Sequence, residues 1–173
     1  MATTTVAPVT EYLRKSYRPD RDYVDGEIRE RNLGDRDHAD LQSRFVFLLC
    51  LPENAAHATA RSELRVQVSP TRFRVPDVCV LRKSAPRKQI VTQTPLLCIE
   101  ILSPEDTMLR TRERVRDFLE MGVPQVWIVD PASRSISICA GTTMVEQTAG
   151  ELKVPETPVV LALADIFKVL DEY

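Results

Sequence analysis

The sequence predicts an α/β fold in which a mixed β-sheet is flanked by helices on both faces. Residues 96–102 and 125–129 are almost continuously apolar, as strands are when both faces of their sheet are covered. A segment with helical periodicity lies between them, so this unit predicts a right-handed parallel crossover. At 173 residues the chain has the length of one domain. We therefore expect a flexible tail over residues 1–8 and a single domain over residues 9–173.

The N-terminal third predicts two helices around a strand. A short helix is expected over residues 10–16, and residues 23–31 predict a first strand in which Asp25-Gly26 favours a bend. The next helix carries an apolar stripe at three-to-four spacing, and either Asp35 or Asp37 can cap it. Pro52 ends this helix, and its stripe comprises Leu41, Phe45, Leu48 and Leu49.

Two strands are predicted in the middle of the chain. Residues 63–69 alternate between apolar and polar side chains, a pattern typical of a half-buried strand. A turn at Ser69-Pro70-Thr71 leads to the next predicted strand, residues 73–81. The two strands are therefore expected to be neighbours.

The crossover helix has clear boundary signals. Ser103-Pro104-Glu105-Asp106 offers a cap, a proline at the first helical position and acids in the first turn. The helix is expected to run to about Met121, because Gly122 terminates it and Pro124 prevents its continuation. After the second apolar strand, alternation over residues 135–139 predicts an outer strand. Residues 163–170 predict a final helix.

The composition is that of an ordinary globular domain, 43% apolar and 28% charged. No stretch approaches the roughly 18 apolar residues of a membrane helix, and the first eight residues lack signal-peptide features. We therefore expect a cytoplasmic protein with no membrane partner. The 4 cysteines are scattered without a C-x-x-C pair, so they predict small buried side chains rather than a zinc site or disulfides.

The net charge of −2 gives no overall attraction to nucleic acid. A nuclease remains compatible with it, because an acidic metal site contributes negative charge that a bound ion neutralises. Arginines and lysines gather over residues 61–88 and again over residues 110–116. Each stretch is either a track for phosphates or a solvated face with scattered ion pairs.

Two isolated acids are the most informative residues. Glu100 is the single charged residue of its apolar strand. Asp77 is likewise the single charged residue within the otherwise apolar residues 75–81. A buried carboxylate costs several kcal/mol unless it is paired or binds a metal. Two strands that each bring one carboxylate to a shared point would form a site for Mg²⁺, which takes one or two carboxylates plus waters and phosphate. For Glu100 the alternative is an ion pair with an arginine across the sheet. For Asp77 the alternative is that the Pro76-Asp77 dipeptide is ordinary turn chemistry.

These residues and their neighbours resemble a known family. Pro76-Asp77 followed by Glu100 is similar to the PD-(D/E)XK nuclease pattern. The strings CIEILSP, from Cys98, and GVPQVWIVDP, from Gly122, resemble the Uma-two family of restriction endonucleases within that superfamily. YVDGE, from Tyr23, and His38 fit the family's opening. The resemblance extends over about residues 11–139.

The resemblance implies a restriction-endonuclease-like core within a nuclease-like domain, and phosphodiester hydrolysis in DNA. It implies Mg²⁺, with Mn²⁺ as a substitute, held by Asp77 and Glu100. It also implies Glu27 and His38 as accessory site residues, although each alone would be read as solvent-facing. Cleavage of both DNA strands would favour a homodimer with one site for each strand.

The chain departs from the family at one functional position. The family has no lysine two residues after the glutamate, where this chain has Leu102, and its lysine comes from the following helix at the position of Arg114. Arg114 lies one turn before Phe118 and can lean over the sheet toward Glu100. Arginine stays protonated, so it cannot act as a general base, but it can orient a phosphate and stabilise developing charge.

Two functions are consistent with these observations. The first is a Mg²⁺-dependent DNA endonuclease with Asp77, Glu100 and Arg114 as its catalytic residues. The alternative is a catalytically degenerate nuclease-fold module that binds nucleic acid or protein, in which Arg114 neutralises Glu100 without metal. A different hydrolase using the same carboxylates is a third reading, and neither a Ser–His–Asp constellation nor a G-x-G-x-x-G loop supports it.

Overall fold

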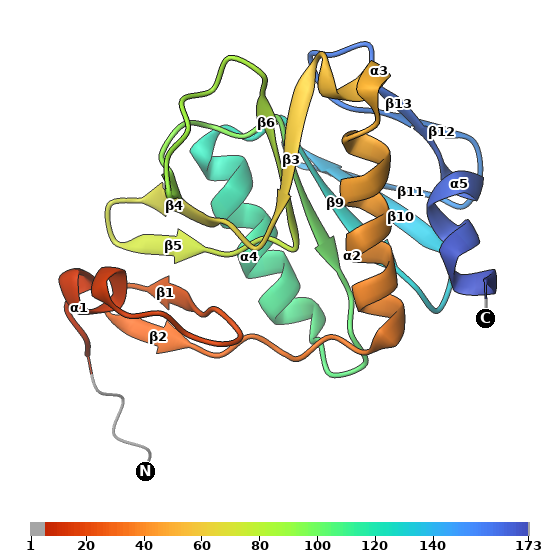
Figure 1. Ribbon diagram of the computed structural model, residues 1–173. Helices are drawn as coiled ribbons and strands as arrows, with labels where there is room; N and C mark the ends of the chain where they lie inside the picture. Colours follow the sequence, from red (N-terminus) through yellow and green to blue (C-terminus); the bar gives the residue numbers. More distant parts are fainter. Residues whose placement is uncertain (1–5, 173) are drawn as a thin grey trace.

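The computed structural model describes residues 6–172, and a six-stranded mixed sheet forms its centre (Figure 1). The strand order is β11-β10-β9-β8-β6-β3. Only β8 and β9 are parallel within this sheet, and α4 (Met108–Met121) connects them, which confirms the predicted crossover unit. The strands are β3 (Ala58–Ser62), β6 (Val78–Arg82), β8 (Leu97–Ile101), β9 (Gln125–Asp130), β10 (Ser135–Ala140) and β11 (Thr143–Gln147).

Helices cover both faces of this sheet, as predicted, and an apolar core fills each interface. On one face α2 (Arg36–Leu49) buries its predicted stripe, including Leu41 and Phe45, against β6 and β8. The short elements α5 (Leu163–Phe167), η1 (Lys168–Asp171), β12 (Glu151–Lys153) and β13 (Val160–Ala162) extend that core. On the other face α4 packs through Val115 and Phe118. Figure 1 shows α2 and α4 on opposite sides of the strands.

A second, five-stranded sheet lies beside α4, with the order β2-β1-β5-β4-β7. Helix α1 (Val9–Arg14) closes it through Tyr12, which stacks on Tyr23 and packs on Phe73. The strands are β1 (Asp22–Val24), β2 (Glu27–Arg29), β4 (Arg65–Ser69), β5 (Arg72–Arg74) and β7 (Ile90–Val91), and α3 (Pro52–Ala55) follows α2.

The strand predicted over residues 73–81 is divided between the two sheets. Its first part is β5 in the five-stranded sheet, and its second part is β6 in the six-stranded sheet. Pro76 lies at the break, where its missing N–H prevents continuous pairing. Asp77 therefore follows directly at the junction of the two sheets.

The strand predicted over residues 23–31 is a hairpin. Asp25 and Gly26 have φ values of 50° and 98°, which suits the two-residue turn between β1 and β2. The start of α4 also differs from the prediction, because Thr107 is the N-cap and its hydroxyl accepts from the Arg110 amide. Residues 103–106 instead form a turn closed by the Asp106 carboxylate, which accepts from Ser103 N. Gly122 ends α4 with φ 100°, as predicted.

The chain ends and the cysteines complete the comparison. Residues 1–5 of the predicted tail lie outside the described residues, whereas the Ala7 amide donates to Gly26 O and Ala7 is buried. Three of the four free cysteines are buried, and Cys50 is exposed at the end of α2. Within residues 6–172, none of the helices has the length and apolar character that crossing a bilayer requires.

Candidate functional site

The register of the central sheet brings Asp77 and Glu100 together. Val78 pairs with Ile99 in the antiparallel ladder between β6 and β8, so the residues one step further along face each other. The Ile101 amide donates to Asp77 Oδ2 over 2.7 Å. Both acids are buried, with only 3% and 6% of their surfaces exposed, and both line one pocket. The structure therefore places both acids in one pocket, at neighbouring positions of adjacent strands.

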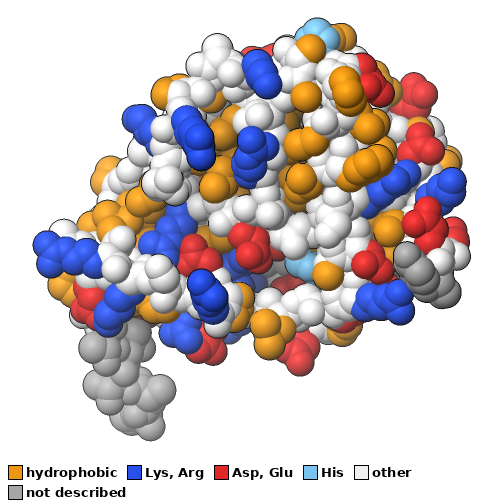
Figure 2. Space-filling model, viewed as in Figure 1, with side chains coloured by type: hydrophobic (Ala, Val, Ile, Leu, Met, Phe, Trp, Pro, Cys, Tyr) orange, Lys and Arg blue, Asp and Glu red, His pale blue; other side chains and the backbone are white. Residues whose placement is uncertain are grey.

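The pocket lies where the two sheets meet the first turns of α2 and α4. In Figure 2 acidic and basic side chains gather around a hollow in the lower part of the molecule, near the segment that joins β2 to α2. The lining is almost entirely polar. Besides the two acids, it includes Asp22, Arg29, Arg31, Asn32, His38, Arg74, Asp106, Arg110, Glu113 and Arg114.

Asp77 is held as a carboxylate. Arg31 Nη2 donates to its Oδ1 over 2.6 Å, and His38 Nε2 lies 3.2 Å from its Oδ2. Burial alone would raise the pKa of Asp77, but the contact with His38 and the charge of Arg31 outweigh it and hold that pKa below its usual value. The same carboxylate raises the pKa of His38 against the opposing effect of burial. His38 is fixed in the first turn of α2, where its amide donates to the Asp35 cap.

Glu100 is in the opposite electrostatic situation. Burial raises its pKa to about 7, the neighbouring Asp77 charge adds to the effect, and Arg114 offsets part of it. Arg114 binds it bidentately, with Nε donating to Oε2 over 3.0 Å and Nη2 donating to Oε1 over 2.9 Å. The pocket therefore tolerates one ionised acid more readily than two.

Arg114 reaches Glu100 from α4, as predicted, and is fixed by further contacts. Its Nη1 donates to Asp22 Oδ2 and its Nη2 donates to the Val75 carbonyl over 2.8 Å. The surrounding acids raise its pKa well above the ordinary value despite burial. Arg114 is thus a permanently charged and immobilised group, suited to charge stabilisation and not to proton abstraction.

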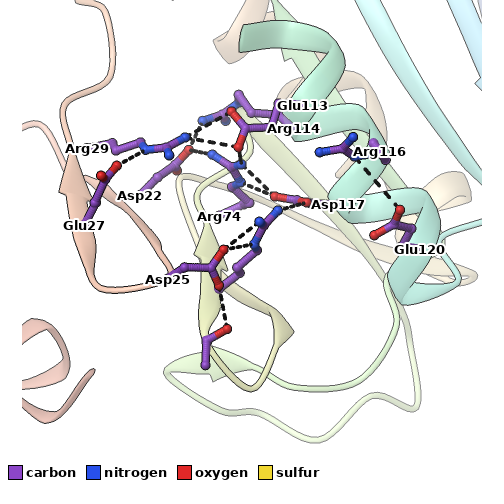
Figure 3. A network of polar contacts seen from close by, with 12 residues as sticks. Asp22, Asp25, Glu27, Arg29, Arg74, Glu113, Arg114, Arg116, Asp117 and Glu120 are labelled. Atoms are coloured by element: carbon purple, nitrogen blue, oxygen red, sulfur yellow. Dashed lines mark hydrogen bonds and ion pairs between the residues drawn. The ribbon is translucent and has the colours of Figure 1, made fainter. Parts of the chain in front are cut away.

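An ionic network supports Arg114 from behind (Figure 3). Asp22 also accepts from Arg74 Nη1 over 3.0 Å and from the Val75 amide over 2.9 Å. Arg74 is buried and reaches Asp117 of α4, with Nε donating to Oδ2 over 2.7 Å. The network therefore connects the β1–β2 hairpin and β5 with α4, and holds the guanidinium of Arg114 over the pocket.

Of the two accessory residues, the structure brings only His38 to the pair of acids. Glu27 lies on β2, where it pairs with Arg29 Nε over 3.0 Å and does not line the pocket. Asp22, Arg31 and Arg74 were missed by the sequence reasoning. The sequence gives little indication of these three residues, because the residues that they contact lie far away along the chain and only the fold brings them together.

The donor set is compatible with a hard divalent ion. Among residues 6–172 there is no cluster of three or more His, Cys, Asp or Glu side chains placed to hold a metal, so the site offers a pair of carboxylates. Each carboxylate has about four lone-pair positions. Asp77 uses three in the contacts above and Glu100 uses two, which leaves free acceptor capacity. Mg²⁺ commonly takes one or two carboxylates and completes its shell with water and phosphate.

Comparisons with known proteins agree with the predicted resemblance. The family model Uma2, described as "Putative restriction endonuclease", matches residues 10–168. A crystal structure of "a putative nuclease belonging to DUF820" from Anabaena variabilis ATCC 29413 is similar, with a TM-score of 0.81 and 23% identity over 94% of this chain and 99% of that chain. At this identity the similarity shows the fold. No curated protein matches the sequence.

Proposed function

The chain belongs to the Uma2 family, and from this premise we propose that it is a Mg²⁺-dependent DNA endonuclease that hydrolyses phosphodiester bonds at Asp77 and Glu100. The family description supports a nuclease as the general activity. One observation carries the finer proposal. Two buried acids from neighbouring strands line the same pocket, and a fixed arginine lies against one of them.

Asp77 and Glu100 are the residues that would hold the ion. When bound there, Mg²⁺ or Mn²⁺ would polarise the phosphate and favour ionisation of a water molecule. The protein prepares Asp77 for this role, because Arg31 and His38 keep it ionised at neutral pH. Glu100 reaches its ionised form less readily, so a cation between the two acids would stabilise its carboxylate.

Arg114 would act on the phosphate and not on the nucleophile. Its charge is permanent, and Asp22 and the Val75 carbonyl fix its orientation. A guanidinium held in a buried pocket stabilises negative charge that develops on a transferring phosphoryl group more strongly than one in water. Because Arg114 cannot accept a proton, it does not supply a base at this position.

Cleavage assays on single-stranded and double-stranded DNA test the proposal. We expect Asp77→Asn and Glu100→Gln to reduce cleavage in Mg²⁺ or Mn²⁺ by at least about 100-fold, since each removes one of the two acidic ligands. Asp171→Asn is the matched control, because Asp171 is an exposed acid that pairs with Arg134 far from the pocket. Circular dichroism would verify folding. Unchanged cleavage in both site variants would overturn the assignment.

A second function, binding without catalysis, is favoured by the bidentate pair of Arg114 and Glu100, which neutralises the acid without metal. Arg114→Lys separates the two functions. If wild-type protein cleaves DNA and this variant loses activity, arginine is the working residue. If wild-type protein is inactive and the variant cleaves, the natural site is degenerate.

A further inference from the structure

We propose that a basic groove beside the carboxylate pocket holds a single DNA strand and leads one of its phosphates to Asp77 and Glu100. This inference rests on the proposed nuclease function and specifies the form of its substrate. The groove is lined by Arg18 and Arg21 before β1, by Arg31 and Leu33 after β2, and by Arg110 in the first turn of α4.

The groove and the carboxylate pocket are continuous. Arg31, Asn32 and Arg110 line both, and so do Arg29 and Glu30 of the β2 region. A chain lying in the groove therefore passes the mouth of the pocket without crossing another element. This continuity gives an extended substrate a direct route to the two acids.

The charge of the groove suits a polyanion. Five arginines line it against two glutamates, although the whole chain has a net charge of −2. Arg21, Arg29 and Arg31 already pair with acids of the protein. The side chains of Arg18 and Arg110, in contrast, are exposed and have no hydrogen-bond or ion-pair partner within residues 6–172. These two guanidinium groups are available for phosphates.

The depth of the site favours one strand over an intact duplex. Asp77 and Glu100 are 3% and 6% exposed, and a hydrogen bond from Asn32 Nδ2 to Asp106 Oδ1 joins two segments that line the pocket. A duplex has a persistence length of about 150 base pairs and bending it sharply costs free energy, whereas a single strand can follow a recess at a much lower cost. Leu33, 73% exposed beside these arginines, provides an apolar contact for an unpaired base.

Fluorescence anisotropy with a labelled single-stranded oligonucleotide and its duplex, in EDTA across a salt series, tests the groove independently of cleavage. We expect tighter binding of the single strand. The pair Arg18→Ala/Arg110→Ala should weaken that binding about tenfold and lower the slope of log K against log salt by about 1.4, because each lost phosphate contact on a single strand contributes about 0.7.

Lys83→Ala/Arg87→Ala is the matched control. Both residues are exposed, lie outside the groove and have no partner within the described part of the chain. Equal weakening by the two double variants, or equal affinity for duplex and single strand, would overturn the inference.

The outcome also separates this inference from the proposed function. If Asp77→Asn abolishes cleavage while the groove variant binds and cleaves like wild type, the groove is wrong and the nuclease assignment stands. If the groove variant loses binding while no cleavage is found in Mg²⁺ or Mn²⁺, the groove stands and the nuclease assignment fails.

Discussion

The two faces of the six-stranded sheet are stabilised in different ways. Between α2 and the sheet the buried stripe belongs to an apolar core, and Leu41 and Phe45 are fully buried. On the opposite face the fully packed apolar residues of α4 are Val115 and Phe118, with Leu119 and Met121 partly buried beside them. Arg114 and Asp117 of the same helix turn toward β1 and β5. The pocket with Asp77 and Glu100 lies on this charged side.

This difference indicates a division of roles. Apolar contacts are non-directional and tolerate small adjustments, so the apolar stripe of α2 stabilises the fold without fixing a polar atom. The polar contacts of this helix to Asp77 come from His38 and Gln42, outside the stripe. Buried ion pairs contribute little net stability but are costly to break. The α4 face therefore holds Arg114 in one orientation through several buried ion pairs, and removing a member of this network should affect stability strongly.

The largest expected effect is a loss of stability on replacing Arg74, which belongs to the buried ion-pair network beside α4. Arg74→Met removes the most buried cation of the network, so that Asp22 keeps only Arg114 and Asp117 keeps only the partly exposed Arg72. We expect a loss of about 3–5 kcal/mol in the free energy of unfolding. Arg72→Met is the matched control, because Arg72 is partly exposed and its removal leaves Asp117 paired with Arg74. Chemical denaturation measures both. Equal losses would show that burial of the pair is unimportant.

Truncation of the apolar face should have a similar or smaller effect on stability and none on the site. Leu41→Ala removes a fully buried side chain, which costs about 2–5 kcal/mol. Cleavage for each folded molecule should remain that of wild type at temperatures where the variant stays folded. Leu109→Ala, at an 81% exposed leucine, is the control. A Leu41→Ala protein that is fully folded yet inactive would contradict the division of roles.

A smaller effect is expected in the pH dependence of stability, which should have opposite signs for Glu100 and Asp77. The pKa of Glu100 is raised from 4.5 to about 7, so its contribution to metal-free stability is present below pH 4.5 and is lost as pH rises through 7. The pKa of Asp77 is lowered, so its contribution is present above its ordinary pKa and is lost as pH falls.

Denaturation in EDTA between pH 4 and about pH 8 measures this contrast. Relative to wild type, Glu100→Gln should become more stable as pH rises, and Asp77→Asn should become less stable. The exposed control Asp171→Asn should show only a weaker trend in the same direction as Asp77→Asn, because the hydrogen bond with Arg134 lowers the pKa of this solvent-screened acid. Identical trends for Glu100→Gln and Asp77→Asn would contradict the opposite environments assigned to the two acids.

The sequence predicted most of the fold and the two acids because both rest on local pattern. Glu100 is conspicuous as one charge within an apolar strand, and the stripe of α2 repeats at helical spacing. Short strands with weakly apolar residues were missed, as in β3, whose sequence ATARS buries only its two alanines. The division of one predicted strand at Pro76 was missed because an apolar run carries no sign of which sheet each half joins.

The supporting network was not predictable for a different reason. Asp22 binds Arg74 and Arg114, which are 52 and 92 positions away. The chain has many arginines, and tertiary packing alone determines which of them bind Asp22. Arg114 was expected near Glu100 because helix periodicity and the family pattern both pointed to it.

The central claim is that Asp77 and Glu100 share one divalent ion, and a crystal grown with Mn²⁺ tests it most directly. The account predicts one anomalous peak between the two carboxylates in the wild-type protein and no peak there in Glu100→Gln. A wild-type crystal without that peak at millimolar Mn²⁺, with Arg114 still bound to both oxygens of Glu100, would contradict it.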